Sequence, residues 1–218
     1  MSAIDELEFV KPAEIEARSF QIIGEELGNR TFADAHTELV VKRVIHTSAD
    51  FEYADTLSFT EQAVERGIQA LAQGASIVTD TKMAAAGINK RVLGSFGGQV
   101  LNYISDPDVA AEAAERGLTR AAVSMERAAQ EEGPLVFAIG NAPTALVQLY
   151  QMISEGRMQK PALIIGVPVG FVNVVESKEL IRERDVESIV ARGRKGGSNV
   201  AASICNALLY IASNDRRE

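Results

Sequence analysis

The fold is decided by one stretch of sequence, LVFAIGNAPTALVQLY, which occupies residues 135–150. Its first five residues form a continuous apolar run, which is typical of a strand buried on both faces of a sheet. Gly140 then breaks the run, and Pro143 suits the start of a helix that we expect to end near Gly156. A buried strand, a short turn and a helix together make the repeating unit of a parallel sheet.

The same unit recurs on both sides of this stretch. Apolar runs at 76–79, 99–104, 162–165 and 187–191 are expected strands, and helical patterns follow at 80–86, 105–131, 173–184 and 198–212. Gly117 is expected to divide the long helical region. Three more helices are expected earlier, over 12–27, from Asp34 through His46, and over 60–73. The pattern predicts a single three-layer α/β/α domain over 1–218, with a doubly wound, mostly parallel sheet of about five strands.

The charge of the chain narrows the class of ligand. Its 218 residues include 22 basic and 30 acidic side chains, which gives a net charge of −8. Non-specific nucleic-acid binding needs a basic face, so we expect no nucleic-acid partner. Basic residues still cluster at 42–43, at 90–91 and over 192–195. Each cluster alone is most often a solvated face, but together they are compatible with an anionic ligand.

Three features predict a cytoplasmic protein. The one cysteine, Cys205, lies in an apolar helical pattern, so we expect a packing thiol in a reducing compartment. The first twelve residues have neither the basic region nor the apolar core of a signal peptide. The longest apolar stretch, 161–175, is broken by prolines and glycines, so we expect no membrane span.

The residues that follow the predicted strands have the composition of a binding site. Parallel strands end at one edge of the sheet, so the loops after them meet there. Glycine-rich turns that precede helices bind anions through free backbone N–H groups. Basic and amide side chains interleaved with apolar ones favour a wide ligand that has an apolar body and several carboxylates. The expected contacts are Asp80, Lys82, Met83, Asn141, Gly170, Phe171, Arg194, Lys195, Gly196, Gly197 and Ser198.

Several common kinds of site are disfavoured. The loop at 192–199 lacks the spacing of a phosphate-binding GxxxxGK[ST] loop, and no GxGxxG follows any predicted strand. There is no GxSxG turn, and no cluster of His and Cys has metal-ligand spacing. We therefore expect no nucleotide, no dinucleotide and no protein-bound metal.

His46 is the candidate proton donor. Asp34 is a plausible N-cap for its helix, which places His46 in the last turn, where the helix dipole favours imidazolium. Arg43 lies three residues earlier, so both side chains leave the same face. A titratable group beside a fixed cation suits a general acid next to an anionic substrate. Taken alone, a lone histidine at a helix end is more often a cap or packing residue, and we expect His36 to lie on the surface.

A series of motifs spans nearly the whole chain in one order, and jointly they are highly specific. They are EARSF at 16–20, KRVIHTSADF at 42–51, TDTKMAAAGINKR at 79–91, FGG at 96–98, YISDP at 103–107, GLTR at 117–120, IGNAPTALVQL at 139–149, GVPVGFVNVVESKEL at 166–180 and ARGRKGGSNVAASICNALLY at 191–210. With these motifs the chain resembles the precorrin-8X / cobalt-precorrin-8 methylmutases of cobalamin biosynthesis.

The resemblance implies a cytoplasmic α/β homodimer that isomerises a corrin precursor. The family moves a methyl group from carbon 11 to carbon 12 of ring C in a suprafacial 1,5 shift, without an organic cofactor. The matching histidine, His46, is implied to protonate the ring-C region. Ser19, Arg43 and Arg120 are the implied substrate contacts, and the arginine of the matching GxTR motif is thought to reach the substrate of the neighbouring subunit. The ligand would be a corrinoid with a carboxylate rim, which agrees with the composition of the loops.

Alternatives remain at this point. The wording of the motifs resembles the cobalt-handling branch, in which cobalt arrives inside cobalt-precorrin-8 and the product is cobyrinic acid. The metal-free branch converts precorrin-8X to hydrogenobyrinic acid. A non-catalytic tetrapyrrole carrier would have the same site and differ only in lacking turnover. A nucleotide-binding α/β protein is the third reading, and the missing phosphate-binding motifs disfavour it.

Overall fold

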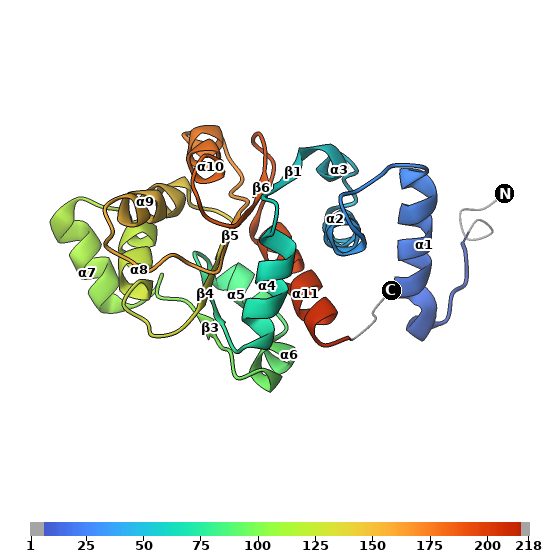
Figure 1. Cartoon of the computed structure of the whole chain (residues 1–218), viewed down its shortest axis with the longest axis horizontal. Coiled ribbons are helices and arrows are strands. Elements are labelled where there is room, and N and C mark those ends of the chain that lie inside the picture. Colours follow the sequence, from blue (N-terminus) through green and yellow to red (C-terminus); the bar gives the residue numbers. More distant parts are fainter. Residues whose placement is uncertain (1–6, 215–218) are drawn as a thin grey trace.

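The computed structural model of the chain describes residues 7–214. Its centre is a six-stranded sheet in the order β1-β6-β5-β4-β2-β3 (Figure 1). All neighbouring strands are parallel except β1, which pairs with β6 in the antiparallel direction. The strands are β1 (Leu57–Phe59), β2 (Ser76–Thr79), β3 (Val100–Leu101), β4 (Leu135–Ile139), β5 (Leu163–Gly166) and β6 (Ser188–Ala191).

Helices cover both faces of the sheet (Figure 1). The α-helices of the described residues are α1 (Ile15–Leu27), α2 (Ala35–Ser48), α3 (Tyr53–Thr56), α4 (Ala63–Ala72), α5 (Lys82–Gly87), α6 (Lys90–Ser95), α7 (Pro107–Arg116), α8 (Arg120–Ala128), α9 (Pro143–Ser154), α10 (Val174–Arg182) and α11 (Ser198–Ala212). The predicted three-layer, mostly parallel α/β/α architecture is confirmed.

Strand β4 shows why both faces must be covered. Its five residues are all buried, and successive side chains point to opposite faces. Val136 and Ala138 join the core formed with α2, α4 and α11, whereas Leu135, Phe137 and Ile139 join the core formed with α8, α9 and α10. The apolar run at 135–139 therefore contributes side chains to both hydrophobic cores.

Several predicted boundaries differ from the structure. Strand β1, the one-turn helix α3 and helix α6 were not predicted from the sequence. The predicted strand at 99–104 is shorter, since only Val100 and Leu101 pair with β2, and the Asn102 side chain then donates to the Thr79 carbonyl at 2.9 Å. The predicted helix at 80–86 begins later, because Thr81 caps α5 by accepting from the Ala84 amide at 3.0 Å.

Other local predictions are confirmed. Asp34 caps α2 by accepting from the Thr37 amide at 2.8 Å, and His46 lies in the last turn of that helix. Gly117 ends α7 with a φ of 63°, so the long helical region divides there as expected. Cys205 is fully buried, and burial raises the pKa of its thiol to about 12.

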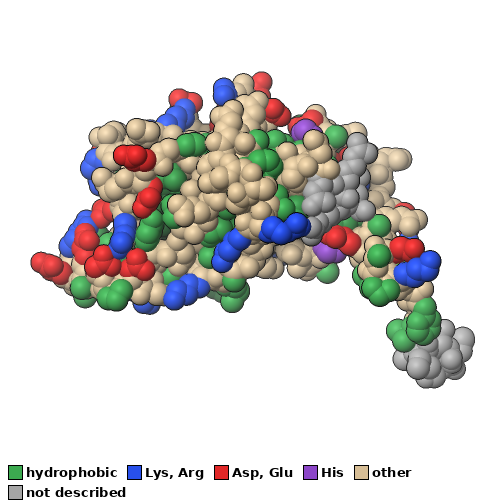
Figure 2. Space-filling model, turned by 90° about the horizontal axis from the view of Figure 1, so that it is seen from below, with side chains coloured by type: hydrophobic (Ala, Val, Ile, Leu, Met, Phe, Trp, Pro, Cys, Tyr) green, Lys and Arg blue, Asp and Glu red, His purple; other side chains and the backbone are tan. Residues whose placement is uncertain are grey.

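Helix α1 stands apart from the two helical layers. It packs on the outer side of α2, and in Figure 1 it forms the right-hand end of the molecule. Seen from below, the same end narrows into a projection (Figure 2). In the first turn of α1 and the segment before it, Ile15, Leu7 and Phe9 have exposed apolar side chains. Within 7–214, no helix is both long enough and apolar enough to span a bilayer. The expectation about a signal peptide rests partly on residues 1–6, which lie outside the described part.

Candidate active site at the carboxyl edge of the sheet

The predicted site loops meet at the carboxyl ends of the strands. The Thr81 and Ser198 hydroxyl oxygens lie 2.8 Å apart, which joins the loop after β2 to the start of α11. The Gly197 amide donates to the Val167 carbonyl at 2.8 Å, which joins the loops after β6 and β5. The loop 192–199 is thus the centre of the predicted site.

Two glycines allow this close approach. A β-carbon on Gly140 would lie 2.7 Å from Ser198 Cα, and one on Gly196 would lie 2.1 Å from the Val167 carbonyl oxygen. Gly196 also has a φ of 157°, a conformation that residues with a side chain rarely adopt. Gly140 and Gly196 therefore allow the backbones of neighbouring loops to pack in direct contact.

Asp80 holds the turn after β4. It is 2% exposed, and its two carboxylate oxygens accept from the amides of Gly140, Asn141 and Ala142 at 2.9, 2.8 and 2.7 Å. Burial raises the pKa of Asp80, and the three amide donors oppose that rise. We predicted that Asp80 contacts the ligand, whereas its carboxylate points into the protein and accepts from backbone amides. Asn141, which the turn carries, is exposed.

Lys178 is a residue of the site that the sequence did not reveal. It is completely buried, and its ammonium donates to the carbonyls of Gly193 and Lys195, each at 2.8 Å. Burial lowers its pKa to about 8. One signal was present: Lys178 lies four residues after Val174 and three before Ile181, on the buried stripe of α10.

The cations of the loop 192–199 are arranged differently from one another. Lys195 pairs with Asp50 at 2.6 Å and with Glu52 at 2.8 Å, so it ties the loop to the segment that follows α2. Arg192 donates to the Asp55 carbonyl at 2.7 Å. Arg194 is exposed and places its guanidinium 5.4 Å from the centre of the Phe171 ring. The exposed pair of Arg194 and Phe171 joins charge to an apolar surface, as predicted for these loops.

The same segment brings the end of α2 to this edge. Leu57, the first residue of β1, pairs with Ala191, the last residue of β6. Since α2, α3 and β1 follow one another closely, the last turn of α2 lies near the loop that leaves β6. Asp50, four residues after His46, pairs with Lys195 of the loop 192–199, so the loop contacts the segment that directly follows the His46 helix.

His46 packs against a side chain from α1. Its ring stacks on Phe20 with centroids 5.1 Å apart and an interplanar angle of 21°. The Arg43 guanidinium lies 4.5 Å from the centre of the same Phe20 ring, so Arg43 and His46 share a face as predicted. Arg43 also forms an ion pair with Glu16. Ser19, next to Phe20, donates its hydroxyl to the Ile15 carbonyl at 2.9 Å.

The protonation of His46 departs from our expectation. We expected the helix end to favour imidazolium, but the pKa of His46 is lowered. Partial burial is the main cause, the positive charge of Arg43 lowers the pKa further, and Glu16 opposes both. The imidazolium form is therefore disfavoured in the ligand-free chain, and an anionic ligand would restore it.

The remaining predicted contacts lie at the periphery. Lys82 and Met83 are exposed in the first turn of α5, and Met83 is 72% exposed. Arg120 is exposed at the start of α8, where the Thr119 hydroxyl lies 2.8 Å from that of Thr144. Helices α8 and α2 cover opposite faces of the sheet. Arg120 and His46 of one chain therefore belong to different helical layers. His36 is exposed, as predicted.

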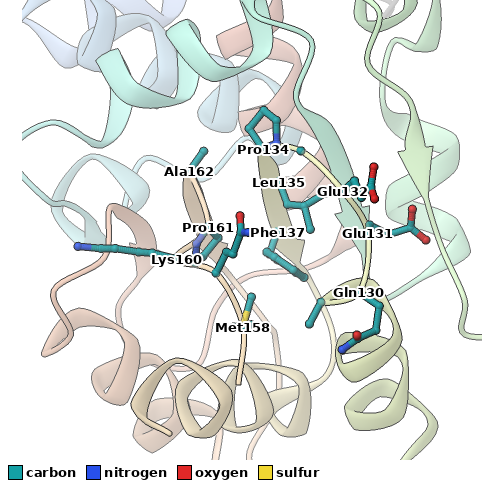
Figure 3. A pocket seen from close by; sticks show the side chains of 13 residues that line it. Gln130, Glu131, Glu132, Pro134, Leu135, Phe137, Met158, Lys160, Pro161 and Ala162 are labelled. Carbon is teal, nitrogen blue, oxygen red and sulfur yellow. The ribbon is translucent and has the colours of Figure 1, made fainter. Parts of the chain in front are cut away.

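A separate cavity of about 620 Å³ lies at the opposite edge of the sheet (Figure 3). Its walls come from β4 itself and from the segments that precede β4 and β5, among them Glu131, Leu135, Met158 and Lys160. No predicted site residue lines it. In the part of the chain that the structure describes, no group of three or more His, Cys, Asp or Glu could hold a metal ion.

Comparisons with known proteins agree on one family. The family profile of precorrin-8X methylmutase matches residues 14–211. The cobalt-precorrin-8 methylmutase of Priestia megaterium is 45% identical over 205 residues, which cover 94% of this chain and 90% of the relative. That of Salmonella typhimurium is 46% identical over 207 residues, which cover 92% of this chain and 95% of the relative.

Two further comparisons extend the likeness. A precorrin-8X methylmutase of Pseudomonas aeruginosa is 42% identical over 176 residues, which cover 80% of this chain and 84% of the relative. A solved structure of the precorrin-8X methylmutase from Thermus thermophilus matches with a TM-score of 0.84 and 38% identity, and the match covers 93% of this chain and 98% of that chain. The likeness therefore holds in sequence and in three dimensions over nearly the full length of both.

Proposed function

This chain belongs to the precorrin-8X methylmutase family, and from that premise we propose that His46 is the general acid of its reaction. The chain is an isomerase of cobalamin biosynthesis that moves the ring-C methyl group of a corrin precursor from carbon 11 to carbon 12. One observation carries the proposal for His46: its ring and the Arg43 guanidinium pack on the same Phe20 ring. The segment that follows His46 contacts the loop 192–199 through the Asp50–Lys195 ion pair.

The proposed reaction needs no covalent bond between the protein and the substrate. His46 donates a proton to the ring-C region, the methyl group migrates within the macrocycle, and the proton is returned, so atoms and charge balance. Catalysis then consists of holding one face of the ring and stabilising charge as the methyl moves. The exposed side chains of Met83, Phe171 and Arg194 suit such a ligand, because they offer apolar contact and a cationic anchor for the carboxylate rim.

We propose that no cofactor is held by the protein and that cobalt, when present, arrives inside the substrate. The proposal for cobalt-precorrin-8 follows the names of the Priestia and Salmonella relatives. The product would then be cobyrinic acid. We also propose that the protein works in the cytoplasm, as the family resemblance implies.

The proposed assembly is a homodimer in which Arg120 serves the site of the neighbouring subunit. The placement of Arg120 supports this, because its helix covers the face of the sheet opposite to that of α2. The exposed apolar side chains of Leu7, Phe9 and Ile15 provide a surface on which a second copy could pack.

The function is tested by a visible spectrum and a thermal shift. Mixed with cobalt-precorrin-8, the protein should convert the spectrum of the precursor to that of the corrin product, which a non-catalytic carrier would not do. Cobyrinic acid at ~100 times its Kd should raise the free energy of unfolding by about 2.7 kcal/mol and raise Tm accordingly. ATP and NAD serve as controls. A shift with either nucleotide and none with cobyrinic acid would overturn the assignment.

Substitution of Arg43 and Arg120 tests the proposed ligand contacts and the shared site. Arg43→Ala and Arg120→Ala should each weaken binding of cobyrinic acid by an amount equivalent to roughly 1.5–3 kcal/mol, because each loses a charge-assisted hydrogen bond.

Heterodimers of Arg120→Ala and His46→Ala chains, verified by differential tags, should regain part of the activity through the one intact site. Absence of recovery would count against a shared site. Arg66→Ala, on the exposed side of α4, is the matched control.

A further inference from the structure

Lys178 is an unusual residue, because it is a fully buried lysine whose partners are backbone carbonyls. Its ammonium is bound by the carbonyls of Gly193 and Lys195 at 2.8 Å each. Within residues 7–214, no carboxylate lies at ion-pair distance from it. Burial of an ammonium without a counter-ion is costly, so lysine is among the residues least often fully buried. Its position therefore points to a local role in the loop it binds.

The two carbonyls flank Arg194 on both sides. In a trans peptide, the C=O of one residue and the N–H of the next point in opposite directions. No peptide bond in the described chain is cis. Because the carbonyls of Gly193 and Lys195 turn inward to Lys178, the amides of Arg194 and Gly196 turn away from it. Lys178 thus sets the orientation of two amide donors that lie two residues apart.

These two amides remain available for a ligand. Among the described residues, neither the Arg194 N–H nor the Gly196 N–H donates to another protein group. The Arg194 carbonyl, in contrast, accepts from the Gly170 amide at 3.2 Å, so the backbone of Arg194 is fixed from a second side. Outward backbone N–H groups of neighbouring residues can bind one anion, as they do in the concave sites called nests.

Charge favours an anion at the same place. The ammonium of Lys178 faces the negative ends of two peptide dipoles, so their positive ends face outward. The Arg194 guanidinium stands beside them over the Phe171 ring. Carboxylates are the anionic groups of the proposed ligand, and they bind strongly to paired N–H donors.

We propose that Lys178 is a positioning residue that presents the Arg194 and Gly196 amides as a subsite for one side-chain carboxylate of the corrinoid. The inference rests on the proposed function for its ligand. Lys178 itself is buried beneath the loop and does not touch the ligand.

The experiment compares two ligands on one variant. In Lys178→Met, the Kd for cobyrinic acid should rise about 10-fold, the equivalent of one charge-assisted hydrogen bond, while the Kd for fully methyl-esterified cobyrinic acid changes less than about 2-fold. KM should rise with little change in kcat. Lys178→Gln, which keeps an N–H donor, should recover part of the affinity. Lys160→Met, at the other edge of the sheet, is the matched control.

Each outcome decides the question. Equal loss of acid and ester binding by a folded Lys178→Met, or unchanged acid binding, would overturn the inference and leave the function intact. If that variant does not fold, hydrogen exchange on the wild-type chain takes its place: cobyrinic acid should slow exchange at the Arg194 and Gly196 amides, and unchanged exchange there would overturn the subsite. A wild-type chain that binds neither corrinoid would overturn the proposed function, and this inference with it.

Discussion

Replacement of His46 by alanine should lower kcat by about 10²–10⁴-fold while binding of cobyrinic acid is largely retained, since a general acid typically contributes a factor of that size. The structure places His46 in the last turn of α2 with one face of its ring against Phe20. His36→Ala, on the exposed start of the same helix, is the control. Near-normal turnover in the His46 variant would remove His46 from the role of acid.

The pH dependence of the wild-type enzyme follows from the same residue. In its proposed role as general acid, His46 must carry its proton, so the rate is expected to fall as pH rises through the pKa of His46. In the free chain that pKa is lowered from the ordinary value of about 6.5 by burial and by Arg43. The fall in kcat/KM, which reports the free enzyme, should therefore lie below that value. A polycarboxylate ligand favours the charged form, so the fall in kcat should lie at a higher pH than that in kcat/KM. Coincident falls would contradict the proposed ligand effect.

Asp80→Ala should lower the free energy of unfolding by about 2–4 kcal/mol. The change leaves three backbone amides without their acceptor, at a cost of roughly 1–3 kcal/mol for each one that stays buried. Relief from burying a carboxylate offsets part of this, because burial raises the pKa of Asp80. Urea unfolding measures the effect, and activity should fall with it because Asp80 holds the turn that carries Asn141.

A matched carboxylate serves as the control for Asp80. Asp185 is fully exposed and pairs with Lys160 at 2.9 Å on the surface, so Asp185→Ala should change the free energy of unfolding by less than about 0.5 kcal/mol. Equal effects of the two substitutions would show that the Asp80 hydrogen bonds contribute nothing special to the turn.

The sequence was most informative where local pattern and tertiary packing agree. The apolar run at 135–139 and the stripe of valines ahead of His46 predicted β4 and α2, because each has the period of the element it forms. Strand β1 was missed because three residues without a flanking turn signal carry too little pattern. Its pairing with β6 comes from a segment about 130 residues away in the chain.

The site was predicted by residue type better than by role. Asp80 follows a strand, as ligand contacts often do, but only the structure shows that three amides of another loop enclose it. Lys178 lies in a charged stretch, ESKEL, that is typical of a surface helix. The sign of the His46 shift was wrong because its main cause, burial, includes the Phe20 ring that α1 supplies.

The pairing of Leu57 with Ala191 has a consequence for the order in which the enzyme is made. His46 is synthesised early. Strand β1, which follows its helix closely, can pair only after β6 has been synthesised, much later in the chain. Helix α11, which packs closely on α2, is later still. Contacts so distant in sequence form slowly, and synthesis proceeds from the N-terminus. A nascent chain therefore carries His46, the proposed proton donor, long before the loop 192–199 and α11 have been synthesised.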